Sequence, residues 1–271
     1  MIALLRNQGI VVAGSAFQRA AHTSMPRQST ALLSFSRRMA YALRRPVWAA
    51  LLVVSFGIPA RAQTKQIWPE VSTFVKLHDQ MRFYFLMTTV KEDRESTEGE
   101  FGPNFDFYLK PLRKHKQRLG VFRLDESKNR LLMVRVGYHY IHPYTSGGSD
   151  EQRGILEATG RYPLVGGVLV SDRNRIDLRS VGGEYSWRYR NRLTVEREFS
   201  IGRFRFGPYA RVEGFYDSRY NKWSRTALTA GSTFPITKHF ELEGYYEHQN
   251  DSGGSSNRQV NGVGSVLNLY F

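Results

Sequence analysis

The sequence predicts an all-β fold, a transmembrane antiparallel β-barrel of about twelve strands, and three observations support this prediction. Apolar and polar residues alternate over most of the chain after residue 65, as in strands with two different faces. The alternating runs are about 10–15 residues long, whereas strands of globular proteins have about 5–6 and a tilted bilayer-crossing strand needs about 9–11. The last residues alternate back from a terminal phenylalanine, which is typical of the final strand of an outer-membrane barrel.

The chemistry of the two strand faces is clearest in residues 184–198. Tyr185 and Leu193 share one face, while Arg190 lies on the other face among further arginines and glutamates. Residues 203–216 repeat this division. An outer-membrane barrel turns its apolar face to lipid and encloses a polar interior. We therefore expect the aromatic and aliphatic faces to point outward and the charged faces to line a lumen.

The inward charges form a predicted lumen network. The inward charges nearly balance at eleven arginines and nine acidic residues when Glu198 and Glu247 are counted, as required because buried charges are tolerated only when they are paired. The network comprises Arg153, Glu157, Arg161, Arg173, Arg175, Asp177, Arg179, Glu184, Arg188, Arg190, Arg192, Glu196, Arg203, Arg205, Arg211, Glu213, Glu241 and Glu243. These side chains either fill a narrow interior as a structural network or line a narrow pore with a weak preference for anions.

Twelve segments of the sequence are predicted to be strands, which agrees with the even strand number of bacterial barrels. They span 67–77, 80–90, 100–110, 117–125, 129–142, 150–163, 167–180, 184–199, 203–216, 219–234, 238–249 and 258–271. Basic residues blur the pattern at 117–125, so ten strands are the alternative. Both ends of the barrel chain are then expected in the periplasm. Turns near 126–128, 164–166, 200–202 and 235–237 are expected at that end, and the loops 143–149 and 250–257 at the outer end.

The chain divides into three predicted segments. Residues 1–38 are an unstructured leader or an over-extended gene start, and 39–62 are a signal peptide. Arg44 and Arg45 precede an apolar run of about twelve residues, too short to span a bilayer, and Ala62 ends an A-x-A-type cleavage site. Cleavage after Ala62 leaves 63–271 as the barrel and predicts a bacterial outer-membrane location. There Phe271, Leu269 and Leu267 form the expected signal for the outer-membrane assembly machinery.

Composition excludes several classes of protein. The 271 residues contain no cysteine, which excludes disulfides, cysteine-ligated metals and a cysteine nucleophile. A mean hydropathy of −0.44 is too polar for a bundle of transmembrane helices. The net charge of +15 does not indicate nucleic-acid binding, because the arginines alternate with glutamates behind a signal peptide. No cofactor or metal site is predicted. Expected partners are outer-membrane lipid and lipopolysaccharide, whose phosphates suit Arg219, Lys222 and Arg225, and the oligomeric state stays open.

Several motifs resemble one family of bacterial proteins. They are Ile67–Val71 (IWPEV), Ser171–Arg175 (SDRNR), Trp187–Thr194 (WRYRNRLT), Glu213 before Phe215-Tyr216, and the closing Leu267–Phe271. Through these motifs the chain from Gln66 to Phe271 resembles the domain-of-unknown-function 2490 family of uncharacterised outer-membrane β-barrels. The resemblance implies a fold and a location. It implies no catalytic residues.

Three functions remain open from the sequence. The favoured one is a non-enzymatic outer-membrane protein, either structural or a narrow solute channel. An outer-leaflet hydrolase is the alternative, with His248, Ser252 and His139 as candidate catalytic residues, although their spacing matches no known Ser–His pair. A soluble periplasmic ligand-binding barrel is the third, and it requires the aromatic faces to point inward.

Overall fold

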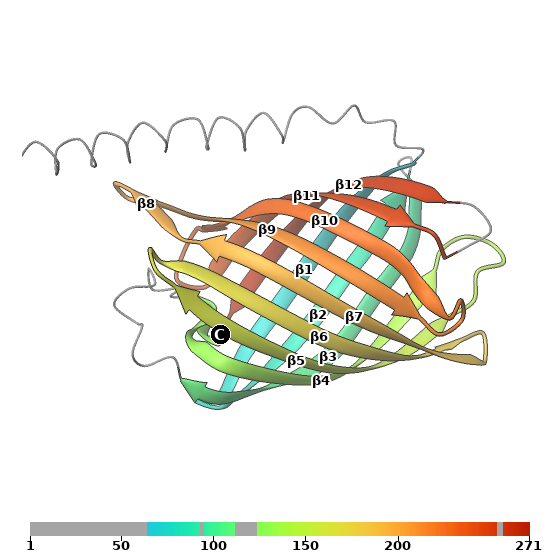
Figure 1. Ribbon diagram of the computed structural model, residues 1–271, viewed down its shortest axis with the longest axis horizontal. Coiled ribbons are helices and arrows are strands. Elements are labelled where there is room, and N and C mark those ends of the chain that lie inside the picture. Colours follow the sequence, from blue (N-terminus) through green and yellow to red (C-terminus); the bar gives the residue numbers. More distant parts are fainter. Residues whose placement is uncertain (1–63, 93–94, 112–123, 254–256) are drawn as a thin grey trace, which may run out of the picture. The chain divides into compact units, whose positions relative to one another are not determined.

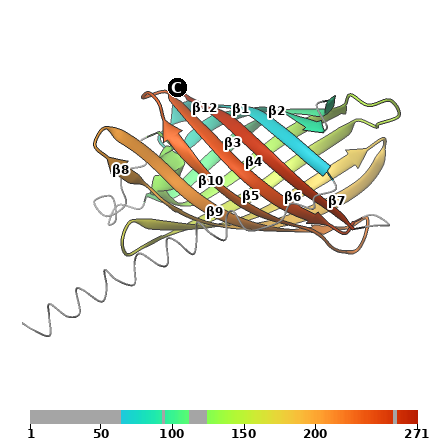
Figure 2. The ribbon, with the colours of Figure 1, turned by 90° about the horizontal axis from the view of Figure 1, so that it is seen from above.

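The computed structural model describes residues 64–92, 95–111, 124–253 and 257–271, which fold into a β-barrel (Figures 1 and 2). Its elements are β1 (Thr64–His78), β2 (Met81–Glu92), β3 (Glu95–Pro111), the short 3-10 helix η2 (Glu126–Asn129), β4 (Arg130–Pro143), β5 (Glu151–Leu164), β6 (Val168–Val181), β7 (Glu184–Arg197), β8 (Phe199–Ile201), β9 (Phe204–Asp217), β10 (Lys222–Pro235), β11 (Phe240–Asp251) and β12 (Arg258–Tyr270). The predicted all-β barrel is confirmed. All but one of the predicted strands overlap an observed strand along most of their length.

The barrel closes through a parallel pair of strands. Successive strands of the ring pair antiparallel, but β1 pairs parallel to β12, from Thr64 opposite Val260 to Phe74 opposite Tyr270. Eleven of the twelve strands form the ring, and the short β8 pairs with β9 outside it. The even strand number expected for the ring is therefore wrong. The total of twelve is reached only through β8, which the sequence did not predict as a separate strand.

The predicted strand 117–125 has no place in this ring. β3 pairs directly with β4, so no strand lies between them. Residues 117–123 lie outside the described ranges, and the two residues after them lead into η2 without joining a strand.

The odd ring places the two ends of the barrel chain apart. Because β1 and β12 run in the same direction, Thr64 and Phe271 lie at opposite ends of the barrel, and the prediction that they share one end is wrong. The Phe271 end also holds η2 and the connections at 165–167, 198–203 and 236–239. The Thr64 end holds the connections at 144–150 and 252–257. The predicted grouping of turns and loops into two sets agrees with this arrangement.

Two glycines allow a two-residue turn between β6 and β7. β6 and β7 are joined by Gly182 and Gly183, with Val181 paired to Glu184. The φ angles of these glycines are +58° and +93°. A two-residue hairpin of this kind needs positive φ at both central positions, where a side chain would clash with the backbone. The local sequence thus fixes the register between β6 and β7.

The outer and inner faces of the wall differ in chemistry. Every strand of the ring exposes at least one large apolar side chain on the outer face. Examples are Ile67, Met87, Phe105, Val136, Leu156, Ile176, Leu193, Val212, Leu228, Leu242 and Val263. The buried side chains are largely polar or charged, and Asp106 and Asp177 are fully buried. The outward apolar and inward charged faces therefore have the predicted orientation.

Two further sequence features bear on this description. The predicted leader at 1–38, the signal peptide at 39–62 and its cleavage site after Ala62 lie outside the described residues. Within the part of the chain that is described, no helix has the length and apolar character needed to cross a membrane.

Candidate functional site

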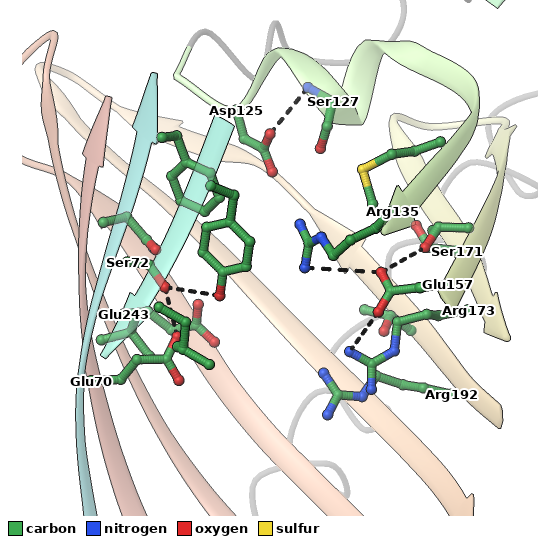
Figure 3. Close-up of a pocket in the computed structure, with 18 of the residues that line it drawn as sticks. Glu70, Ser72, Asp125, Ser127, Arg135, Glu157, Ser171, Arg173, Arg192 and Glu243 are labelled. Carbon is green, nitrogen blue, oxygen red and sulfur yellow. Dashed lines mark hydrogen bonds and ion pairs between the residues drawn. The ribbon is translucent and has the colours of Figure 1, made fainter. Parts of the chain in front are cut away.

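A cavity of about 400 Å³ lies inside the barrel, beneath η2 (Figure 3). Every strand of the ring contributes to its lining, which includes ten basic and eight acidic side chains. Alternate residues of a strand share one face, so the period of two in the sequence collects these charges in the interior. The cavity is the candidate functional site.

Glu213 on β9 is the centre of one ion-pair cluster. Its carboxylate accepts hydrogen bonds from Arg173 at 2.7 Å, Arg190 at 2.8 Å and Arg192 at 2.5 Å. These residues stand on β6, β7 and β9, which are neighbours in the ring. Glu213 is only 4% exposed, and Glu157 adds a second carboxylate 3.7 Å from Arg173. Three guanidinium groups around one carboxylate leave this side of the cavity rich in positive charge.

A second cluster surrounds Asp106 on β3. Asp106 accepts hydrogen bonds from Arg82 at 2.8 Å and from Arg135 at 2.5 Å, and it is fully buried. The Arg82 guanidinium lies 4.2 Å from the ring centroid of Phe74, and that of Arg135 lies 4.2 Å from the centroid of Tyr84. Hydrogen bonding and ring stacking together hold both guanidinium planes in one orientation.

A third cluster lies towards the Thr64 end. Asp217 pairs with Arg179 and Arg188 at 3.2 Å and with Arg219 at 2.9 Å. Arg179 also pairs with Glu151 at 2.7 Å. Most charges in the interior are therefore compensated by partners on adjacent or nearby strands, as buried charges require.

The structure brings most of the predicted network into the barrel interior. The members found there are Arg153, Glu157, Arg161, Arg173, Arg175, Asp177, Arg179, Arg188, Arg190, Arg192, Glu196, Arg211, Glu213, Glu241 and Glu243. Arg205 lines a separate hollow near Pro235 at the Phe271 end. Glu184 and Arg203 are exposed at turns and form no ion pair with any described residue, so their assignment to the network is wrong. The alternation of polar and apolar residues in the sequence continues into these turns, where the side chains lie beyond the end of the barrel wall.

Several interior residues were missed by the sequence analysis. Arg82, Asp106, Arg135, Glu70 and Glu100 all line the cavity or pair inside it. They occupy the polar positions of alternating segments in the first four strands. Alternation carries a signal for them, because Asp106 lies between Phe105 and Phe107, but a single charge in an aromatic-rich segment is a weaker pattern than the arginine runs of β6 and β7.

The 3-10 helix η2 is tied to the wall at the Phe271 end of the cavity. Asp125 caps it by accepting a hydrogen bond from the Ser127 amide at 3.0 Å. The same carboxylate pairs with Arg82 on β2 at 2.8 Å, and Lys128 pairs with Glu196 on β7 at 2.5 Å. These ion pairs reach two separate strands of the ring. η2 is thus fixed across the end of the cavity.

Opposite charges keep both η2 groups ionised. Burial raises the pKa of the Asp125 carboxyl, but Arg82 and Lys128 outweigh it and hold this pKa well below its usual range. Burial lowers the pKa of the Lys128 ammonium, while Glu196 and Glu241 raise it above its usual range. The contact of Asp125 with Arg82 therefore weakens only when Asp125 takes up a proton at acid pH.

His139 belongs to the interior network. Its Nδ1 lies 2.5 Å from Glu100 and its Nε2 lies 3.1 Å from the Asn104 side-chain oxygen. A Cβ at Gly102 would lie 2.2 Å from the imidazole, so glycine is needed there for the ring to fit. Both ring nitrogens thus contact Glu100 and Asn104 rather than a serine hydroxyl. This geometry does not support His139 as the base of a serine hydrolase.

The other hydrolase candidates are not brought together either. His248 lies on the outer face of β11, where its Nδ1 is 2.7 Å from the Asn261 side-chain oxygen. Ser252 donates from its hydroxyl to the Ser224 carbonyl oxygen at 3.3 Å. No hydrogen bond joins His248 and Ser252 in the described structure. In the described ranges there is also no group of three or more His, Asp or Glu residues placed to hold a metal ion.

One polar cluster interrupts the apolar outer face. Asn191 donates to Asp172 at 2.8 Å and to Asn174 at 3.1 Å, and Tyr189 donates to Asn174 at 2.5 Å. Asn174 and Asn191 stand opposite each other on β6 and β7, and Asp172 and Tyr189 are diagonal neighbours of this pair. They satisfy one another through side-chain hydrogen bonds, which lowers the cost of placing polar groups on this face.

The fold and its interior define a closed β-barrel with a charged, internally paired lumen. The family model for the proteins of unknown function called DUF2490 matches residues 65–260, and the chain belongs to this family. The family predicted from the sequence motifs is thereby confirmed. The chain matches none of the curated proteins with which it was compared.

Proposed function

We propose that this protein is an outer-membrane β-barrel that forms a narrow solute channel with a weak preference for anions. The observation that carries the proposal is the chemistry of the wall, which is apolar outside and charged around an internal cavity. This division is the reverse of a soluble barrel, where the apolar faces must meet in the core. The soluble ligand-binding alternative therefore has no support from the described residues.

The outer face supports the membrane location. Large apolar side chains are exposed on all eleven strands of the ring, whereas a soluble monomer rarely exposes a contiguous apolar patch above a few hundred Å². In lipid every backbone hydrogen bond must be satisfied, and a closed ring has no unpaired edge. A bilayer is the environment that suits this surface and this closure.

The apolar side chains at the end of β12 suggest an orientation. Phe271 and Leu267 are exposed and Leu269 is half-buried, and we propose that the outer-membrane assembly machinery reads these side chains. We place the Phe271 end in the periplasm and the Thr64 end at the outer surface. Near the outer end, Arg219 pairs with Asp217 and Arg225 with Asp251, and Lys222 is exposed to meet lipopolysaccharide phosphates.

The lining supports the conducting role. At the surface of the cavity ten basic side chains stand against eight acidic ones, while Asp106, Asp177 and Glu213 lie behind the arginines with which they pair. Fixed charges in a pore favour ions of the opposite sign. The paired clusters narrow the interior, so a channel of this kind passes small solutes only.

Single-channel recording tests the proposal. The full chain is purified in detergent, checked for folding by heat-modifiable migration on a gel, and inserted into planar lipid bilayers. Discrete conductance steps and a reversal potential displaced towards that of chloride are expected. A correctly folded barrel without steps would refute the channel and leave a structural role. A chain that stays soluble and folded without detergent would refute the membrane location.

A further inference from the structure

The charges that line the cavity are unevenly distributed among the strands, although Glu157 on β5 and Glu196 on β7 stand among the arginines. Four glutamates of the lining stand on β1 and β11, namely Glu70, Glu241, Glu243 and Glu247. Six arginines of the lining stand on β5, β6 and β7, namely Arg153, Arg161, Arg173, Arg175, Arg190 and Arg192. We call these two sets the carboxylate wall and the arginine wall.

The two walls face each other across the lumen. In the ring, β12 lies between β11 and β1, and it is separated from β6 by five steps in one direction and six in the other. The centres of the two walls are thus diametrically opposed. Figure 3 shows Glu70 and Glu243 beside Ser72 on one side of the cavity, and Arg173 and Arg192 on the other.

The carboxylate wall is short of positive partners. Glu70 accepts a hydrogen bond from the Ser72 hydroxyl at 2.7 Å, and Glu247 accepts bonds from Thr229 at 2.8 Å and Gln249 at 2.6 Å. Neither glutamate forms an ion pair with any residue in the described ranges. These carboxylates therefore keep acceptor capacity for a cationic group in the cavity.

The arginine wall has spare donors. Arg161 is 6% exposed, and its only polar partner among the described residues is the Ser127 hydroxyl, 3.3 Å from its Nη2. Its buried Nη1 has no hydrogen-bond partner, and neither has the buried Nε of Arg173. Arg161 also has no carboxylate within ion-pair distance among the described residues. Burying a guanidinium without a counter-charge is costly, so this wall favours an added anionic group.

We propose that the cavity binds a small zwitterion that carries an ammonium and a carboxylate, such as an amino acid. The ammonium contacts the carboxylate wall at Glu70, and the carboxylate contacts the arginine wall at Arg173, whose Nε has no partner. The opposite charges of the two walls create an electric field across the lumen that aligns the dipole of such a molecule. Its ammonium and carboxylate groups then provide the partners that the carboxylate wall and the arginine wall lack. A simple anion meets the arginine wall but is repelled by the opposite wall. This inference names the solute class of the proposed channel and rests on that function for its physiological meaning.

The ligands for the test differ only in charge. 4-Aminobutyrate carries both charges, butyrate only the negative one, and butylammonium only the positive one. Binding is measured as the ligand-dependent rise in the unfolding temperature of the full chain in detergent. Current block is measured with the same ligands in planar bilayers. We expect 4-aminobutyrate to bind about tenfold more tightly than either single-charge ligand, as one additional ion pair provides.

Charge-neutralising variants identify the two contacts. Glu70→Gln keeps the hydrogen bond from Ser72 and is expected to lower the affinity for 4-aminobutyrate about tenfold, without lowering that for butyrate. Arg173→Gln is expected to lower both affinities. Glu213 keeps Arg190 and Arg192 in that variant, and Glu157 keeps Arg135 at 4.0 Å. The matched controls are Glu184→Gln and Arg203→Gln, which make the same charge changes at exposed turns and should change neither affinity.

The outcomes separate this inference from the channel proposal. Equal affinity for butyrate and 4-aminobutyrate, no binding of any ligand, or an equal loss of both affinities in Glu70→Gln would overturn the zwitterion site. Conductance steps without zwitterion preference would leave the channel intact and refute only this inference. Zwitterion binding with the expected variant effects, but without conductance, would support the site and refute the channel.

Discussion

The outer and inner faces of the same strands are held by different forces. On β7, Leu193 and Val195 are exposed on the outer face, while Arg190 and Arg192 point inward to Glu213. On the outer face, stability depends on the contact of an apolar surface with an apolar environment, and any apolar side chain can provide that contact. Inside, stability depends on particular pairs, because an unpaired buried charge costs several kcal/mol. Substitutions on the two faces should therefore destabilise the barrel for different reasons, which can be tested separately.

The largest effect is expected at Glu213 on β9, which pairs with three arginines of the arginine wall. Glu213→Gln removes the carboxylate that Arg173, Arg190 and Arg192 share and leaves three like charges together. Breaking a buried pair in this way typically costs about 3–5 kcal/mol. The temperature of the heat-modifiable gel shift should fall strongly. Glu184→Gln, at an exposed turn, is the control, and an equal small effect in both variants would contradict the interior network.

The next largest effect is expected on the outer face. Val212 lies in the middle of β9, 46% exposed, and faces Leu193 and Leu228 across the strands. In a bilayer, Val212→Arg should cost about 2–4 kcal/mol near the midplane. The free energy of unfolding by urea in lipid vesicles measures this cost. Val165→Arg, in a turn where Val165 is 91% exposed, is the control. A cost below about 0.5 kcal/mol at Val212, as on a soluble surface, would refute the lipid contact.

A smaller effect is expected where η2 meets the wall. Asp125→Ala removes the contacts with Arg82 and the Ser127 amide, and it should weaken the fixation of η2 by about 1–3 kcal/mol. If η2 restricts the cavity, single-channel conductance should rise or become noisier. Val165→Ala, in another turn at the same end, is the control. Unchanged conductance and stability would show that η2 does not restrict the lumen.

Acid should reproduce the effect of that substitution. The pKa of Asp125 is depressed in the folded state, so its stabilising contribution is present above the unfolded value of about 3.9 and is lost as pH falls below it. The conductance of the unmodified channel should therefore begin to rise only below about pH 4, and that of Asp125→Ala should respond less. A rise centred near neutral pH would point to another group.

The smallest effect is expected at the barrel rim. Arg258 on β12 pairs with Glu92 on β2 at 2.7 Å, and both side chains are substantially solvent-accessible. Ion pairs of this kind contribute about 0–1 kcal/mol and weaken with salt. Glu92→Gln should leave the unfolding temperature nearly unchanged. A fall in the unfolding temperature as large as that caused by Glu213→Gln would show that the stabilisation by an ion pair does not depend on its depth in the barrel.

The sequence determined the strands, the turns and the two faces. A period of two is a local property, and the positions of Arg190 and Leu193 on opposite faces of β7 follow from it directly. The glycine pair between β6 and β7 fixed one hairpin for an equally local reason. The content of the interior was therefore largely readable, apart from isolated charges such as Asp106.

Only the tertiary structure decided how the ring closes and which charges meet. The parallel pairing of β1 with β12 joins residues about two hundred positions apart, and no local pattern distinguishes ten, eleven or twelve strands. The pairing of Lys128 with Glu196 and the separation of the carboxylate wall from the arginine wall also depend on ring order. Alternation sets the face of each residue, but its neighbours across the lumen are set by the number and register of the strands that close the barrel.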